Sequence, residues 1–266
     1  MRNGESGHAV LAVVATVVTI AASIVVGWAT LGTRVQADGL ARVQQAWLQE
    51  VRAALLGWYA RELATVDRVV EAPGADLVMR EAGIVPRWGL RLSVSDRLSR
   101  DGIAYRVLAA WLPAEADASA LDTSTGQFTA SPGARWVVAS GFDLQAGAMA
   151  ETRARLDRLA RQLESVYRAR LLSDPSRDIG INRFRAVRCA VPAPGELPCI
   201  EDYSPIEASG LARAAGIDPL LAVNAWGGVV EASNGTDASA AMPFSLALRT
   251  TTPWGSVLPL FAVAAP

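Results

Sequence analysis

Lysine is absent from this chain, and all 25 basic residues among its 266 residues are arginine. The absence excludes every mechanism that needs a lysine, including Walker-type phosphate loops, Schiff-base chemistry and serine–lysine pairs. The formal net charge is −1, so the chain has no general excess of positive charge for binding phosphates. We therefore expect no nucleic-acid partner.

Histidine occurs once, as His8 near the N-terminus. A histidine base or a histidine-based metal site is therefore excluded from the rest of the chain. Acidic neighbours such as Glu201 and Asp202 are common in solvated loops and do not by themselves make an acid–base pair. We expect no catalytic residue, no metal site and no cofactor, and we predict that the protein is not an enzyme.

Cysteine occurs twice, as Cys189 and Cys199, with several prolines between them. In a domain exported across a membrane, a local disulfide that closes this loop is expected. In a cytosolic domain the same residues would be two unpaired thiols. No histidine lies near them in the sequence, so they make a poor zinc site.

One long apolar run, at residues 9–31, contains no charged residue and no proline. As a helix it would be roughly 35 Å long, which is enough to cross a hydrocarbon core of about 30 Å. Apolar residues then recur at helical three-and-four spacing up to Val70, before a stop at Pro73 and Gly74. The pattern predicts one helix of roughly sixty residues, apolar first and amphipathic afterwards.

The middle of the chain predicts strands and a second helix. Residues 89–95 alternate between apolar and polar, residues 103–112 form a more buried run, and residues 135–140 form a further strand. Residues 113–133 are predicted to be a long loop. A helical pattern follows at 146–172 and carries an arginine-rich face that we interpret as solvated surface.

The last third predicts strands at 227–232 and 243–250, and a final strand at 256–264 with Pro259 inside it, which indicates a sheet edge. Two tryptophan–glycine pairs, Trp226-Gly227 and Trp254-Gly255, lie in similar local sequences. Each pair is expected to clamp a loop onto a sheet, because glycine permits a tight turn while the indole covers the core.

The order of these segments resembles that of the type IV pilin and type II secretion pseudopilin superfamily. A short polar leader ends in Gly7, an apolar helix begins at once, and an amphipathic helix, an antiparallel sheet and a cysteine-containing loop follow. The resemblance implies that a prepilin peptidase cleaves after Gly7, which leaves His8 as the new, methylated N-terminus. It also implies an inner-membrane assembly platform, other pilin or pseudopilin subunits and the lipid bilayer as partners.

Two positions depart from the family pattern. The mature chain would begin with His8 where Phe or Met is usual, and Ala12 lies where members usually carry glutamate. That glutamate pairs with the N-terminal amine of a neighbouring subunit, and a buried unpaired amine would be costly. The resemblance therefore implies a minor or tip subunit of a pilus or secretion filament.

The predicted fold class is α+β. A long N-terminal helix, transmembrane and then amphipathic, packs on an antiparallel β-sheet, with a second helix and additional C-terminal strands. The predicted segments are a leader at 1–7, a transmembrane half-helix at 8–32, an amphipathic half at 33–72 and a globular region at 73–266, divisible into lobes at 73–142 and 143–266.

The expected location is the inner membrane, crossed once, with the N-terminus cytoplasmic and the globular region periplasmic or on an assembled pilus. The alternative is a secreted or signal-anchored periplasmic binding module. Val35, Gln36 and Ala37 before Asp38 fit a signal-peptidase site. The apolar run is longer than the usual signal core of about 7–15 residues, which favours the filament subunit.

Overall fold

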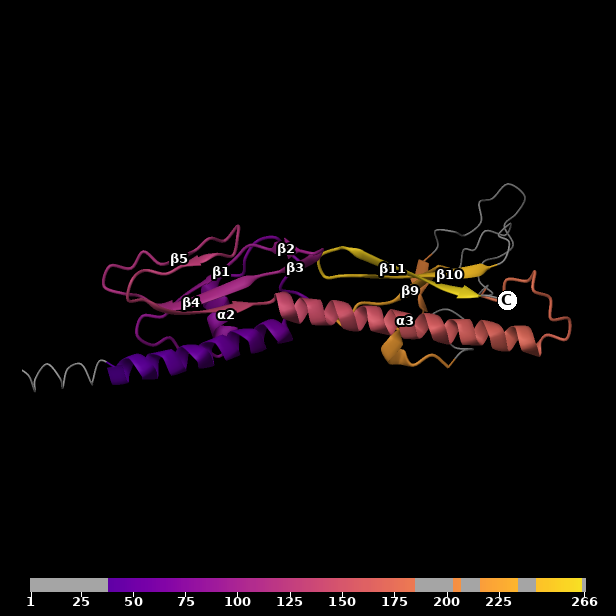
Figure 1. Cartoon of the computed structure of the whole chain (residues 1–266), viewed down its shortest axis with the longest axis horizontal. Coiled ribbons are helices and arrows are strands. Elements are labelled where there is room, and N and C mark those ends of the chain that lie inside the picture. The colour runs from indigo at the N-terminus through magenta and orange to yellow at the C-terminus, as the bar shows by residue number, and fades with distance from the viewer. Residues whose placement is uncertain (1–37, 185–202, 207–215, 234–242, 265–266) are drawn as a thin grey trace, which may run out of the picture.

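Two lobes lie in line along the long axis of the molecule, and each combines an antiparallel sheet with a helix (Figure 1). The computed structural model describes residues 38–184, 203–206, 216–233 and 243–264. The described helices are the segment at 38–61, α2 (Ala75–Glu81) and α3 (Phe142–Ser173), together with a 3-10 turn, η2 (Pro219–Leu221).

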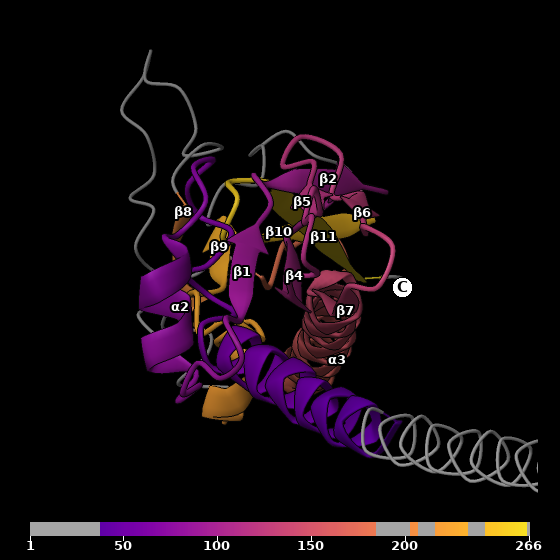
Figure 2. The ribbon, with the colours of Figure 1, turned by 90° about the vertical axis from the view of Figure 1, so that its left-hand side faces the viewer.

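The first lobe is built on a three-stranded sheet in the order β1-β4-β7. Its strands are β1 (Arg91–Val94), β4 (Val107–Leu112) and β7 (Arg135–Ser140). The helix at 38–61 covers one face of this sheet, and α2 lies beside β1 (Figure 2). Since the other face is also covered, β4 is buried along its whole length.

Two hairpins complete the first lobe. One joins β2 (Leu98–Arg100) to β3 (Ile103–Tyr105), and the other joins β5 (Ala120–Leu121) to β6 (Phe128–Thr129). The second hairpin contributes Leu121 and Phe128 to the cluster on the outer face of the sheet. The loop predicted at 113–133 is thus partly wrong: it contains this hairpin, which forms because Leu121 and Phe128 bury apolar surface there.

The second lobe contains a four-stranded sheet in the order β11-β10-β9-β8. Its strands are β8 (Tyr203–Pro205), β9 (Glu231–Ser233), β10 (Phe244–Thr251) and β11 (Val257–Ala264). α3 lies against β11, and its Leu159 and Leu163 share one buried cluster with Leu246 and Leu248 of β10. This packing closes a second core, separate from the core of the first lobe.

Most predicted strands are confirmed because their signals are local, but the strand predicted at 227–232 is largely wrong, since residues 225–227 turn and β9 begins only at Glu231. The segments predicted at 103–112 and 135–140 contain β3, β4 and β7. Asp101 and Gly102 both have positive φ, at 54° and 76°, as a type I′ hairpin turn between β2 and β3 requires. Pro259 lies in β11, which is an edge strand of the second sheet, as predicted.

The predicted long N-terminal helix is wrong. The described helix ends at residue 61, and residues 62–68 form turns in place of the amphipathic helix predicted up to Val70. The longest described helix is α3, with 32 residues. No helix in the described ranges is long and apolar enough to cross a membrane, and residues 1–37, which include the apolar run, lie outside those ranges.

The end of the first helix is set by contacts distant in sequence. Backbone hydrogen bonds Thr65 N–H to Glu62 O and Arg68 N–H to Thr65 O replace the helical pattern with tighter turns. Asp67 is fully buried and lies against Arg106 from the sheet. Helix propensities differ by less than about 1 kcal/mol per residue, so they are outweighed by the cost of leaving the buried Arg106 without the carbonyls of this loop.

Gly141, at the start of α3, lies against the ring of Tyr59, and a Cβ at this position would overlap that ring. Gly141→Ala is therefore expected to destabilise the fold by about 1–3 kcal/mol, since neither the helix nor the buried tyrosine has room to shift. Urea unfolding of the full chain in detergent, followed by tryptophan fluorescence, measures the change.

The matched control is Gly147→Ala, one and a half turns further along α3, where a Cβ would meet nothing within 4 Å. This change should stabilise the helix by roughly 0.5–1 kcal/mol, because glycine is a poor helix former. Equal effects of the two substitutions would contradict the packing described here.

Candidate functional site

The site residues predicted from sequence lie outside the described residues. This applies to Gly7 and His8, the predicted cleavage position, to Ala12, and to Cys189 and Cys199, the predicted disulfide. Cleavage and disulfide formation stay predictions. The chemistry available to the described residues is concentrated in three places: a buried polar cluster, the tryptophan turns at the lobe junction, and a groove on the first lobe.

Arg106 is the centre of the buried polar cluster, and its side chain is fully buried. Its guanidinium donates five hydrogen bonds to backbone carbonyls, four of them in the loop at 66–71. Nε donates to Val66 O at 2.9 Å. One terminal nitrogen donates to Val70 O at 3.2 Å and to Ser95 O at 3.0 Å. The other donates to Val69 O at 2.6 Å and to Glu71 O at 2.8 Å. Every N–H of the side chain is therefore used.

Asp67 gives this cluster its negative charge. Its Oδ2 accepts hydrogen bonds from the hydroxyl of Tyr59 and from Gln145 Nε2, the latter at 2.7 Å. Its Oδ1 lies 3.7 Å from Arg106 Nε and accepts no hydrogen bond from the described residues. The Tyr59 oxygen in turn accepts the backbone N–H of Arg106 at 3.1 Å. Helix, loop and sheet are thus tied together.

Burial dominates the electrostatics of the cluster. It raises the pKa of Asp67 above 3.8, although Tyr59, Gln145 and Arg106 act in the opposite direction. It also raises the pKa of Tyr59 far above its usual value, with a further contribution from the Asp67 carboxylate, and lowers the pKa of Arg106. The side chains of Asp67 and Arg106 have no exposed surface, and their hydrogen bonds join the first helix, the loop at 66–71 and the sheet.

The tryptophan turns meet where the two lobes join. The rings of Trp226 and Trp254 lie 5.4 Å apart at 82°, an edge-to-face pair. The following glycines, Gly227 and Gly255, have φ of 79° and 88°, in the left-handed region that favours glycine. The expected clamp is confirmed for Trp226, which is buried and packs with Ala148 and Met149 of α3.

Gln145 connects this junction to the polar cluster. Trp226 Nε1 donates a hydrogen bond of 2.7 Å to Gln145 Oε1. Gln145 Nε2 donates to Asp67 Oδ2 and, at 3.0 Å, to Leu63 O. A continuous hydrogen-bonded path therefore runs from the second lobe to the centre of the first. This path was not predicted from the sequence. The sequence signals for it are single polar residues inside apolar stretches, above all Arg106.

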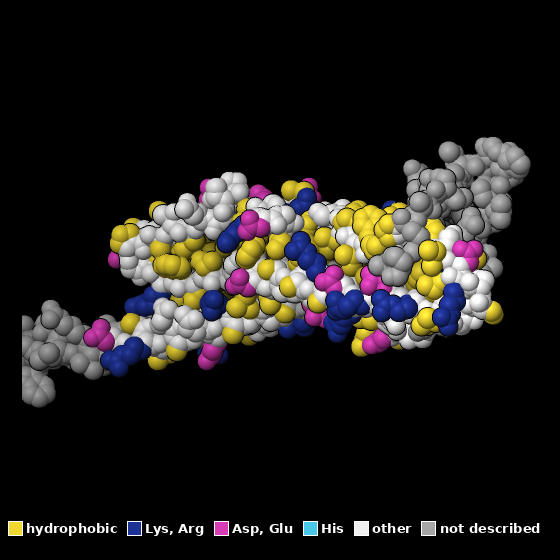
Figure 3. All heavy atoms as spheres, turned by 45° about the vertical axis from the view of Figure 1, so that its right-hand side comes forward, with side chains coloured by type: hydrophobic (Ala, Val, Ile, Leu, Met, Phe, Trp, Pro, Cys, Tyr) yellow, Lys and Arg dark blue, Asp and Glu magenta, His cyan; other side chains and the backbone are white. Residues whose placement is uncertain are grey.

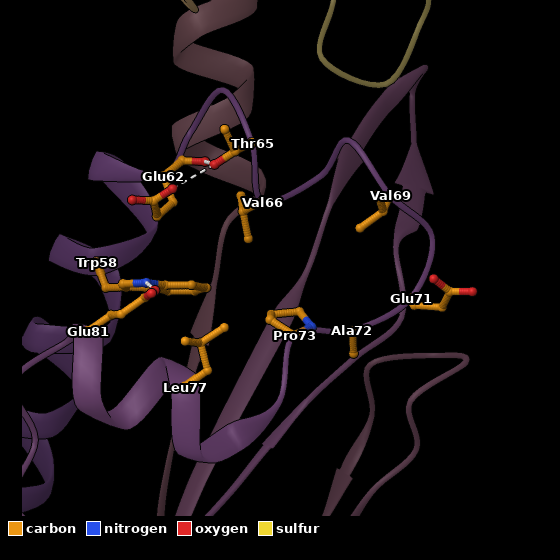
Figure 4. Close-up of a pocket in the computed structure, with 10 residues that line it drawn as sticks. All are labelled: Trp58, Glu62, Thr65, Val66, Val69, Glu71, Ala72, Pro73, Leu77 and Glu81. Atoms are coloured by element: carbon orange, nitrogen blue, oxygen red, sulfur yellow. Dashed lines mark hydrogen bonds between the residues drawn. The ribbon is translucent and has the colours of Figure 1, made fainter.

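The groove on the first lobe lies between the end of the helix at 38–61, the loop after it and α2 (Figure 4). Its volume is about 440 Å³. Apolar side chains line most of it, namely those of Trp58, Val66, Val69, Ala72, Pro73 and Leu77. Val69 and Leu77 are 54% and 38% exposed, so the groove presents apolar surface to solvent.

Three glutamates surround the groove, with Glu62 and Glu81 on one side and Glu71 on the other (Figure 4). Glu81 accepts the indole N–H of Trp58 at 3.0 Å, and Glu62 accepts the hydroxyl of Thr65 at 2.7 Å. These bonds hold two of the carboxylates at the rim. The combination of an apolar floor and an acidic rim suits an apolar group carried next to positive charge.

The groove differs from a metal site. Within the part of the chain that the structure describes, no three histidine, cysteine, aspartate or glutamate side chains are placed to hold a metal ion. What the groove offers is an apolar surface with carboxylates at its rim. Comparisons with protein-family models, with curated proteins and with solved structures found no match to this chain.

Arg106→Lys is expected to destabilise the fold by about 3 kcal/mol or more, because an ammonium has three donors and cannot replace five fixed N–H groups. The loop at 66–71 should then become sensitive to protease. Urea unfolding and limited proteolysis measure both effects. The control is Arg97→Lys, since Arg97 bonds the carbonyls of Asp67 and Arg68 from a partly exposed position; a change below about 1 kcal/mol is expected there. Similar losses for both variants would contradict the role given to Arg106.

The raised pKa of Asp67 predicts a pH dependence that Asp67→Asn removes. The folded state binds the proton of Asp67 more tightly than the unfolded state, so protonation stabilises the fold. As the pH falls through the raised folded-state pKa towards 3.8, the wild type should gain stability relative to the variant. Urea unfolding of both proteins at several pH values tests this difference, and a difference that is constant with pH would refute it.

Proposed function

We propose that this protein is a minor pilin-like or pseudopilin-like subunit that works by packing against other subunits. The observation that carries the proposal is the apolar stripe of the first described helix. From Leu48 onwards this stripe is buried against the sheet, but Leu40 and Val43 on the same stripe are 50% and 57% exposed. Apolar side chains that continue a helix beyond its own sheet are available to a neighbouring subunit.

The sequence before this helix supports the same proposal. The charge-free run at residues 9–31 precedes the exposed positions Leu40 and Val43. In the proposal this run holds the chain in the inner membrane, and both lobes lie in the periplasm. Ala12, in place of the usual glutamate, favours a minor or tip position, where no subunit above contributes an amine to be paired.

The rigid junction between the lobes also suits a structural subunit. Two features of the junction resist bending. They are the hydrogen-bonded path through Gln145 and the edge-to-face pair of Trp226 and Trp254. A filament subunit transmits contacts along its length, so a stiff two-lobed body is useful. The proposal assigns no catalysis to the chain, and its partners are other pilin-type subunits, a prepilin peptidase, an assembly platform and the bilayer.

Processing of the N-terminus tests the proposal. When the full chain is co-expressed with a prepilin peptidase, the mature protein is expected to begin at His8, as intact mass spectrometry and N-terminal sequencing would show. Gly7→Val should abolish this cleavage, because the peptidase requires a small residue before the cut. Gly4→Val, a glycine in the same leader, is the control and should leave cleavage intact.

Two other results would contradict the proposal. A mature chain that begins at Asp38 would indicate an exported periplasmic binding module. An uncut chain that begins at Met1 would indicate a protein held by a simple signal anchor.

A further inference from the structure

A basic stripe runs along the exposed side of α3 in the second lobe. Arg158, Arg161, Arg168 and Leu172 follow helical three-and-four spacing, so their side chains leave the same face. All four are exposed, and Leu172 is 61% exposed near the end of the helix. The stripe therefore combines positive charge with an apolar side chain at its tip.

Two of the three arginines of this stripe form no ion pair among the described residues, although Asp157 and Glu164 lie four residues before Arg161 and Arg168 on α3. Arg158 lies 3.6 Å from Glu151, with both side chains about half exposed. Arg161 and Arg168 form no ion pair with any residue that the structure describes. Arginine side chains gather along α3 in the space-filling view (Figure 3). This surface can accept acidic side chains from outside its own lobe.

The groove on the first lobe has the complementary character. Its floor is apolar, with Leu77 partly exposed, and its rim carries Glu62, Glu71 and Glu81. Two cations lie next to it: Arg61 donates to the backbone carbonyl of Glu81 at 3.1 Å, and the buried Arg106 donates to that of Glu71 at 2.8 Å. Asp67 balances the charge of Arg106, so the three carboxylates exceed the remaining positive charge of Arg61 and the groove attracts a basic surface.

We propose that the basic stripe of one copy docks into the acid-rimmed groove of a second copy, with Leu172 entering the apolar floor. This contact specifies how the proposed filament subunits would join, and in that sense it rests on the proposed function. Charge complementarity between the two surfaces selects the occupant. Arg161 and Arg168 would face the rim glutamates, and Leu172 would approach Leu77.

The two surfaces cannot meet within one molecule. α3 has 32 residues and is therefore about 48 Å long, so it carries Leu172 to the far end of the second lobe (Figure 1). The groove belongs to the first lobe and lies beyond the other end of this helix. A contact between two different surfaces of identical subunits is heterologous, and repeated it produces a ring or an open filament.

Cysteine cross-linking in membranes tests the contact on the full chain. Two differently tagged copies are expressed together, one with Leu77→Cys in the groove and the other with Leu172→Cys on the stripe. A short bis-maleimide should join them into a dimer that carries both tags. Each variant paired with the unmodified chain measures the background from Cys189 and Cys199. The positional control replaces Leu77→Cys with Ala116→Cys, an exposed position of the first lobe outside the groove.

Charge reversal then tests the mechanism. Arg168→Glu on the stripe copy should lower the cross-linked fraction by about tenfold, because it places like charges together. Glu71→Arg on the groove copy should restore it; the Glu71 side chain is exposed, and only its backbone carbonyl bonds Arg106. Arg153→Glu, on another face of α3, is the matched control and should change little.

The outcomes separate this contact from the proposed function. Absence of the specific dimer, equal yield at Ala116, or failure of Glu71→Arg to rescue would each overturn the docking proposal, whatever the N-terminus of the mature chain. A specific, rescued dimer would support it, even if the mature chain did not begin at His8. In that case the contact would stand and the pilin-type processing would fail.

Discussion

Arg106 donates all five N–H groups of its guanidinium to backbone carbonyls, and the structure of the first lobe depends on these bonds. A buried guanidinium is tolerated only when its donors are satisfied and a counter-charge lies near. The loop at 66–71 supplies four carbonyls, and Asp67 supplies the charge. The helix must therefore end before this loop, because the carbonyls of a continuous helix all point along its axis and could not converge on one guanidinium.

The loop at 66–71 contributes both to the groove on the first lobe and to the buried cluster around Arg106. Its carbonyls point inwards to Arg106, while the side chains of Val69 and Glu71 lie along the groove. Asp67 extends the buried cluster to Gln145, which bonds Trp226 of the second lobe. The groove on one lobe and the basic stripe on α3 are thereby held in a fixed relation. A fixed relation between two complementary surfaces is what a repeating contact between subunits requires.

The two tryptophan–glycine turns show how a local signal acquires a tertiary role. Each glycine adopts a positive φ, which the sequence indicates without knowledge of the fold. The sequence does not indicate that the indoles of Trp226 and Trp254 meet edge to face, or that Trp226 reaches Gln145. Those contacts require the second sheet to be folded onto α3 and α3 to be joined to the first lobe. The groove was likewise unpredicted, since its lining residues come from a helix end, a loop and α2.

From the sequence alone we could predict the strands of the first sheet, β10 and β11 of the second, the hairpin turn at Asp101 and Gly102, the edge position of Pro259 and most of α3, but not β8. These features follow from alternation, helical spacing and turn residues, which act between near neighbours. Only the tertiary structure decided where the first helix ends. Its apolar spacing continues through Leu63, Val66 and Val70, so the local pattern favours helix there. Arg106, forty residues after Val66, binds four carbonyls of the loop at 66–71, and a continuous helix could not turn these carbonyls towards one group. A buried guanidinium without acceptors would cost far more than a few helical turns are worth.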